Sequence, residues 1–198
     1  MGIKQNIILF FKFIFVIIMF NSDNNTEGLM LKKYFPDLVA KSVQDIDLEK
    51  LKSINIKGLL VDIDNTLITY SMKEADEKAI NWIKKVNSSE LKICLVSNAR
   101  RKRIEKIRKK LDIPAVFSAR KPSKKAFLKA IDILGIKAKE TAVVGDQIFT
   151  DVLGGNRLGM YTILVVPISK KEFFLIKFKR ILEIYILSKH KKHLLKGK

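Results

Sequence analysis

The 198-residue sequence contains one cysteine, Cys94, so it can form neither an internal disulfide nor a metal site built from several cysteines. Acidic residues are also scarce, because 20 Asp and Glu stand against 39 Lys and Arg, which gives a net charge of +19. No linker rich in Pro, Gly or Ser divides the central part of the chain, and no internal repeat is present. The charge favours polyanionic partners, namely nucleic acid, an anionic membrane or phosphorylated substrates.

The N-terminal apolar run is too short for an ordinary membrane span. Thirteen of the fourteen residues from Ile7 to Phe20 are apolar, whereas a spanning helix needs about 20. No A-x-A-like cleavage site follows the run. We expect residues 1–29 to be an apolar extension outside the domain, with Met30 as the native start. A membrane anchor and an export signal stay open as alternatives.

Short apolar runs alternate with helical patterns after residue 57. The runs are residues 58–63, 91–96, 115–117, 141–144 and 161–166, and helical spacing covers residues 71–86, 99–111 and 123–134. Ser71 and Glu74 predict a capping box for the first helix, and Gly135 predicts the end of the third. Strands that are apolar on both faces and separated by helices predict an α/β fold with a doubly wound parallel sheet, over a domain of residues 30–168.

Polar residues follow four of these runs, at the sheet edge where such folds bind ligands. In chain order they are Asp62, Asp64, Ser97, Asn98, Lys121, Asp146 and Asp151, with Gly145 directly before Asp146. Two carboxylates two positions apart repel each other unless a cation neutralises them, and Mg²⁺ prefers carboxylates, water and phosphate. Each signal alone is weak; Asp151, for example, is also explained by capping of a helix N-terminus. Their joint order, each after its own strand, favours a site.

This order resembles the four motifs of the haloacid dehalogenase-like (HAD) phosphatases, over residues 58–167. The segments at Asp62, Ser97, Lys121 and Asp146 are most similar to the subfamily IIIA proteins of the YqeG type, which are relatives of the mitochondrial phosphatidylglycerophosphate phosphatase. Residues 30–36 also resemble that family's N-terminus. The resemblance implies a HAD-like Rossmannoid core.

The resemblance also implies a reaction. Asp62 would attack phosphorus to form an aspartyl-phosphate, and Asp64 would act as general acid and then as general base. Mg²⁺ would be held by the side chains of Asp62 and Asp146 and by the backbone carbonyl of Asp64.

Further residues are implied in supporting roles. Ser97 and Asn98 would donate to the substrate phosphate, and Lys121 would offset the charge of the phosphate and of Asp62 together. Asp151 would help to hold the metal site, and Thr66 and Gly145 are further supporting residues of the motifs.

The segments between Asp62 and Ser97 and between Ser97 and Lys121 are too short for a cap domain. We therefore expect a capless, open site, which suits a large or surface-bound substrate. A lipid head group is one such substrate, and a phosphoprotein or a nucleic-acid end is another.

The C-terminal tail, residues 169–198, has ten Lys and Arg against two acidic residues. On a helical wheel one face holds Phe174, Leu175, Phe178, Ile181, Leu182, Tyr185 and Ile186, with Glu183 opposite. A basic amphipathic helix of this kind is typical of anionic membrane interfaces; the alternative is a helix packed on the domain. We expect a cytoplasmic protein that is peripheral on the inner face of the membrane.

The sequence thus favours a Mg²⁺-dependent phosphomonoester hydrolase, with phosphatidylglycerophosphate as the expected substrate and a lipid surface as the expected partner. One alternative is a HAD phosphatase for a soluble sugar phosphate or nucleotide. Another is a basic, ribosome-associated RNA-binding protein with an idle HAD core. No specific nucleic-acid partner is expected, because the aromatic and basic strand pattern of single-strand RNA binders is missing.

Overall fold

The structure is a computed structural model that describes residues 31–169 and 174–196, with side chains of the last helix described from residue 179 to 191. Six parallel strands form one sheet in the order β1-β6-β5-β2-β3-β4. Their bounds are β1 (Leu38–Ala40), β2 (Gly58–Val61), β3 (Lys92–Val96), β4 (Ala115–Val116), β5 (Thr141–Gly145) and β6 (Tyr161–Val165). The predicted doubly wound α/β fold is confirmed, with β1 as a short edge strand that the sequence pattern does not reveal.

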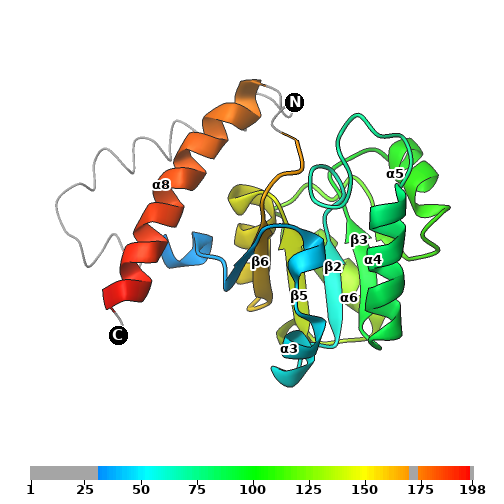
Figure 1. The fold of residues 1–198 in the computed structure, drawn as a ribbon, viewed down its shortest axis with the longest axis horizontal. Coiled ribbons are helices and arrows are strands. Elements are labelled where there is room, and N and C mark those ends of the chain that lie inside the picture. The colour runs from blue at the N-terminus through cyan, green and yellow to red at the C-terminus, as the bar shows by residue number, and fades with distance from the viewer. Residues whose placement is uncertain (1–30, 170–173, 197–198) are drawn as a thin grey trace.

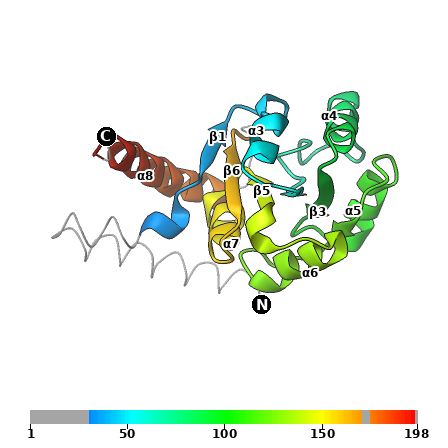
Figure 2. The ribbon, with the colours of Figure 1, turned by 90° about the horizontal axis from the view of Figure 1, so that it is seen from below.

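Helices cover both faces of the sheet (Figure 2). One face packs against α3 (Leu48–Ser53), α4 (Glu77–Ser88) and α5 (Arg101–Arg108), and the other against α6 (Lys124–Leu134) and α7 (Leu153–Asn156). Single turns of 3-10 helix lie at Lys32–Tyr34, Val43–Asp45 and Ala138–Glu140, and a π-helical turn, η4, covers Ile148–Val152. The β2–β3 connection holds α4 and the β3–β4 connection holds α5, so neither contains a cap domain.

The central strands are buried on both sides because their apolar residues alternate between two cores. In β2, Leu59 and Val61 join the core under α3, α4 and α5, whereas Leu60 joins the core under α6. A period of two sends neighbouring side chains to opposite faces of a sheet. Burial on both faces fixes the position of each strand, and with it the residue that follows the strand.

One predicted helix start is wrong. Helix α4 begins at Glu77, and its N-cap is Asp76, whose carboxylate accepts a hydrogen bond from the Ala79 N–H at 2.8 Å. Ser71 does not cap it, because its hydroxyl is 3.1 Å from that of Thr69 in the preceding turn. The predicted end of α6 is confirmed, since Gly135 adopts the left-handed conformation with φ of 62°.

Helix α8 (Phe174–Lys196) lies against the edge of the domain beside β6 (Figure 1). Ile186 is fully buried in a third apolar cluster that includes Tyr34, Ile148 and Leu164. The packed side of α8 therefore matches the predicted apolar face only in part: Ile186 is buried as part of it, but Ile181 is 63% exposed, and Glu183, predicted on the opposite side, is only 5% exposed. Glu183 is tolerated there because its carboxylate is paired, as described below.

Within the described residues, no helix is both long and apolar enough to span a bilayer. The predicted extension, residues 1–29, and the side chains of Phe174, Leu175 and Phe178 lie outside the described part of the structure.

Candidate active site

The polar residues predicted from the sequence gather at the carboxyl edge of the sheet. Asp62 follows β2 directly, Ser97 follows β3, and Asp146 follows β5. Because all the strands are parallel, their carboxyl ends meet at one edge, which is the upper edge in Figure 1. Lys121 reaches the same edge from the loop after β4, and its peptide bond to Pro122 is cis.

Lys121 joins two of the carboxylates. Its ammonium nitrogen lies 2.6 Å from Oδ1 of Asp62 and 2.6 Å from Oδ1 of Asp151, and all three side chains are buried. Gly145 permits this arrangement, because a Cβ atom at that position would collide with the Asp151 carboxyl group. The resemblance implied that Lys121 offsets the charge of the phosphate and of Asp62; in the structure Lys121 is the counter-ion of Asp62 and also of Asp151.

Burial and charge together set the protonation of this pair. Burial raises the pKa of Asp62 to about 6, although the Lys121 ammonium group opposes the increase. Burial lowers the pKa of Lys121, but Asp151 and Asp62 more than offset it, so the pKa lies above its ordinary value. At neutral pH Asp62 is therefore mostly an anion that faces a cationic lysine.

Asp146 is the third buried carboxylate of this edge. Thr66 connects it to Asp62, since its hydroxyl lies 3.4 Å from Oδ2 of Asp62 and 3.5 Å from Oδ1 of Asp146. Burial raises the pKa of Asp146 to about 8, and the Asp62 and Asp151 carboxylates add to the increase, whereas the guanidinium group of Arg180 opposes it.

The three carboxylates fit a divalent cation. Asp62, Asp146 and Asp151 each offer an oxygen, and these oxygens lie within 4.8 Å of one another. Hard oxygen ligands on a few carboxylates are what Mg²⁺ prefers. Burial is the main cause of the raised pKa values of Asp62 and Asp146, and repulsion between the neighbouring carboxylates adds to it.

The Asp64 side chain lies apart from this cluster. Its Oδ1 accepts hydrogen bonds from Nε and Nη2 of Arg103, at 3.1 and 2.6 Å. The third nitrogen of Arg103 donates to the Met72 carbonyl at 2.9 Å, and the guanidinium group lies over the Tyr70 ring. Arg103 thus joins Asp64 to the turn that follows β2.

Ser97 and Asn98 occupy the end of β3 as predicted, but their side-chain oxygens accept backbone hydrogen bonds. Ser97 Oγ accepts from the Ala99 N–H at 3.1 Å, and Asn98 Oδ1 accepts from the Lys121 N–H at 2.7 Å. Asn98 therefore holds the loop that carries Lys121, a role that the sequence does not reveal.

Three further residues at this edge were not predicted, namely Arg103, Arg180 and Glu183. Arg103 and Arg180 belong to basic segments in which nothing distinguishes them from neighbouring Lys and Arg residues. Glu183 offered a signal, since it is one of only two acidic residues in the tail. An isolated acid in a basic helix is a candidate for a specific ion pair.

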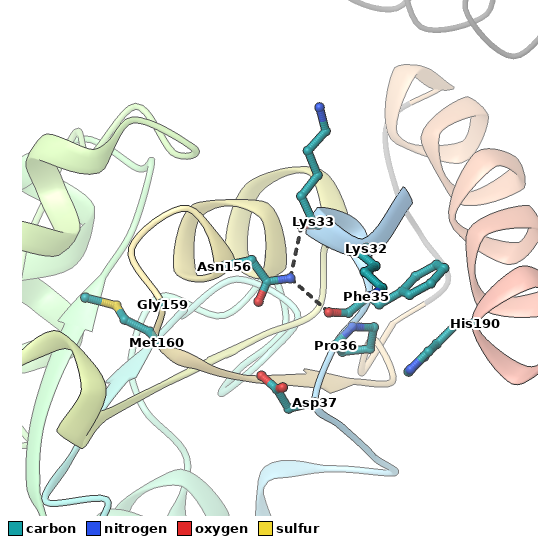
Figure 3. A pocket seen from close by; sticks show the side chains of 9 residues that line it. All are labelled: Lys32, Lys33, Phe35, Pro36, Asp37, Asn156, Gly159, Met160 and His190. Carbon is teal, nitrogen blue, oxygen red and sulfur yellow. Dashed lines mark hydrogen bonds between the residues drawn. The ribbon is translucent and has the colours of Figure 1, made fainter. Parts of the chain in front are cut away.

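A hollow outside this edge lies before the amino end of β6 (Figure 3). Asn156 spans one side of it, donating to the carbonyls of Lys33 and Phe35 at 3.0 and 2.8 Å. The Phe35 ring stacks on His190 of α8. These contacts attach the start of the described chain to α7 and α8. None of the carboxylates at the carboxyl edge lines the hollow.

Several known proteins are similar to this chain in sequence. The HAD-hydrolase-like family model matches residues 118–166. The chain is 42% identical over 168 residues to the probable phosphatase YqeG of Bacillus subtilis, covering 83% of this chain and 98% of that protein. It is 26% identical over 162 residues to the chloroplastic phosphatidylglycerophosphate phosphatase 1 of Chlamydomonas reinhardtii, covering 76% of this chain and 60% of that protein.

Solved structures show a weaker likeness. A HAD phosphatase from Thermococcus onnurineus is 16% identical, with a TM-score of 0.49 over 64% of this chain and 98% of that one. The family assignment depends on the sequence relatives alone. At 42% identity over nearly the full length of the Bacillus subtilis protein, this chain belongs to the YqeG-like branch of the HAD phosphatases.

Proposed function

We propose that this HAD phosphatase uses Mg²⁺ to convert phosphatidylglycerophosphate into phosphatidylglycerol at the surface of an anionic membrane. The main support for the chemistry is the buried Asp62–Lys121 pair at the open carboxyl edge of the sheet. The support for the lipid is the similarity to the Chlamydomonas reinhardtii phosphatidylglycerophosphate phosphatase, together with the missing cap.

In the first step, a carboxylate oxygen of Asp62 attacks the phosphorus atom, and the bond from phosphorus to the leaving oxygen breaks. Asp64 gives its proton to that oxygen, so phosphatidylglycerol leaves as a neutral alcohol and an aspartyl-phosphate remains. Lys121 stabilises the negative charge shared by Asp62 and the phosphoryl group.

In the second step, Asp64 takes a proton from a water molecule whose oxygen attacks the phosphorus of the aspartyl-phosphate. The bond between phosphorus and the Asp62 oxygen breaks, which releases inorganic phosphate and restores both carboxyl groups. Arg103 fixes Asp64 for both proton transfers, because its two hydrogen bonds to one oxygen leave the other oxygen for the proton.

We propose that Mg²⁺ is held by the carboxylates of Asp62 and Asp146 and the backbone carbonyl of Asp64, with Asp151 supporting the site. When bound, the ion supplies positive charge that offsets the charge of the transferring phosphoryl group. Thr66 keeps Asp62 and Asp146 together through its hydroxyl contacts with both. Ser97 and Asn98 are proposed to donate to phosphate oxygens.

Exposed apolar side chains border the site, as a membrane-facing surface requires. Tyr70, after β2, is 54% exposed, and Val166 and Ile168, after β6, are 55% and 50% exposed. The two loops are joined, since the Ile168 N–H donates to the Asn65 carbonyl at 3.0 Å. We call Tyr70, Val166 and Ile168 the apolar rim, and we propose that it enters the lipid head-group region.

Positive charge next to the rim complements an anionic membrane. Helix α5 begins at the same edge, and residues 100–110 contain eight Lys and Arg against one Glu. The basic tail, residues 169–198, adds to the attraction. The protein would then be cytoplasmic and peripheral on the inner face of the membrane, with its site open toward the lipid phosphates.

The experiment is phosphate release from phosphatidylglycerophosphate in anionic vesicles with Mg²⁺, for the wild-type protein and for Asp62→Asn. Both proteins are also assayed on a soluble aryl phosphate. Release from the lipid that disappears in Asp62→Asn and on chelation of Mg²⁺ supports the proposal.

The parallel assay separates the chemistry from the substrate. Release from the aryl phosphate alone, abolished in Asp62→Asn, would contradict the lipid substrate and favour a soluble phosphoester. If neither substrate is hydrolysed while the protein binds RNA in a salt-dependent manner, the idle-core alternative gains support.

A further inference from the structure

Arg180 of helix α8 contacts Asp146, a carboxylate of the proposed metal site. From this helix, Nη2 of Arg180 donates to Oδ2 of Asp146, and Nη1 donates to the backbone carbonyl of the same residue. Both contacts join the C-terminal helix to the residue that follows β5. Arg180 therefore binds Asp146 through two contacts, one to its carboxylate and one to its backbone carbonyl, and not through a single surface ion pair.

A buried glutamate holds Arg180 in this position. Glu183, one helical turn further along α8, accepts from Nη1 of Arg180 at 2.8 Å. Its other oxygen accepts from the Ile148 N–H, also at 2.8 Å, two residues after Asp146. Glu183 is thus fixed to the domain at the start of η4, and through it the Arg180 side chain is fixed toward Asp146.

The packing of α8 adds to this attachment. Ile186, three positions after Glu183, is fully buried against the cluster that contains Ile148 and Leu164. The ionic and apolar contacts lie along one side of the helix at spacings of three, which is the spacing of side chains on one helix face. The packing of α8 on the domain consequently also positions Arg180 at Asp146.

The charges at the edge show what Arg180 does there. Three buried carboxylates, Asp62, Asp146 and Asp151, lie together. Lys121 pairs with Asp62 and Asp151, and Arg180 pairs with Asp146. Arg180 thus neutralises Asp146, the one carboxylate of the three that Lys121 does not contact. Asp146 is also a carboxylate that a divalent ion would bind.

We propose that Arg180 sets the affinity of this site for its divalent cation by competing with the cation for Asp146. Two cations brought to one buried carboxylate repel each other strongly, because the surroundings screen charge poorly. By linkage, the guanidinium contact weakens metal binding by the same free energy as metal binding weakens the guanidinium contact. The inference rests on the proposed metal site, and it adds α8 to that site.

The test is calorimetric titration of the full chain with Mg²⁺, which requires no turnover. Arg180→Gln is expected to bind Mg²⁺ about tenfold more tightly than the wild-type protein. Lys191→Gln, which removes one charge from an exposed position of the same helix, is the matched control and is expected to bind within twofold of wild type. Glu183→Gln loosens Arg180 without removing it, and an increase of about threefold is expected.

Glu183→Gln keeps the test decisive if Arg180→Gln does not fold. Wild-type or weaker Mg²⁺ affinity in the folded variants would overturn the role of Arg180 while leaving the metal site intact. Absence of Mg²⁺ binding in the wild-type protein and in both variants would overturn the metal site, and the inference with it. Binding that appears only in Arg180→Gln would support the inference in its strongest form.

Discussion

Arg103 directs two of its three guanidinium nitrogens at one oxygen of Asp64, at 3.1 and 2.6 Å. Its remaining nitrogen is anchored on the Met72 carbonyl. The side chain thus extends from α5 to the turn after β2 and fixes the proposed general acid between them. This makes the basic helix α5 a part of the site as well as a charged surface.

Arg103→Ala should lower kcat on an aryl phosphate by about ten- to a hundredfold, because hydrogen bonds to a charged group contribute about 1.5–3 kcal/mol. Arg103→Lys should recover part of the loss, since it keeps the charge without the forked geometry. Arg101→Gln, on the exposed side of α5, is the control; equal losses in both variants would reject the positioning role.

Lys121→Met should lower the free energy of unfolding by about 3–5 kcal/mol, because it leaves two buried carboxylates without their partner. Urea denaturation of the metal-free protein measures the change. The loss should be larger at pH 7 than at pH 4. Folding raises the pKa of Asp62, so stability is highest while this carboxyl is protonated and falls as the pH rises through about 6.

The double variant Lys121→Met with Asp151→Asn provides the comparison for this prediction. It removes one of the two stranded charges and should recover part of the lost stability at pH 7. A double variant less stable than Lys121→Met alone would show that charge pairing is not the dominant effect at this position.

Replacing Val166 and Ile168 of the apolar rim by serine should weaken binding to anionic vesicles about tenfold and reduce hydrolysis of the vesicle substrate in parallel. Hydrolysis of a soluble aryl phosphate should stay near the wild-type rate, because neither side chain contacts the catalytic carboxylates in the described structure. Vesicle co-flotation and the two assays measure these effects.

The matched control for the rim replaces Ile54 and Ile133, which are also apolar and are 44% and 46% exposed, but which lie outside the segments at the carboxyl edge. Replacing these two residues by serine should leave vesicle binding unchanged. If the rim and control variants lose binding equally, the membrane contact is general surface adhesion, and the proposed orientation is wrong.

Cys94 should resist alkylation in the folded protein between pH 7 and pH 9. It lies fully buried in β3, and burial raises the pKa of its thiol to about 12, so the reactive thiolate is scarce throughout this range. Intact-mass analysis after treatment with iodoacetamide should show no adduct in native conditions and one adduct in denaturant. Rapid labelling of the native protein would contradict the burial of this strand.

The sequence was sufficient to predict five of the six strands and the residues at their carboxyl ends, because those strands are apolar runs and polar residues follow them; the short edge strand β1 was missed. Asp62 and Asp146 could be placed at one edge for this reason alone. The contacts of Arg103 and Arg180 were not predictable in the same way. Both come from basic segments, and only the packing of α5 and α8 selects which cation reaches a carboxylate.

The tail shows the same limit from another side. A helical wheel groups Ile181 with Ile186 on one apolar face and sets Glu183 opposite, and it leaves open whether that face contacts lipid or the domain. In the structure Glu183 is buried, because it gains an arginine and a backbone N–H, and Ile181 stays exposed. The periodicity of a sequence shows which helix face is apolar, but it does not show which ion pairs or hydrogen bonds a polar residue such as Glu183 forms.

The most direct test of the central claim is chemical trapping of the proposed aspartyl-phosphate. The wild-type protein is mixed with substrate and Mg²⁺, quenched in acid and reduced with borohydride, and residue 62 is then examined by peptide mass spectrometry. The account predicts reduction of the Asp62 acyl-phosphate to homoserine, which is absent without substrate. Turnover of substrate with Asp62 unmodified in every quenched sample would contradict it.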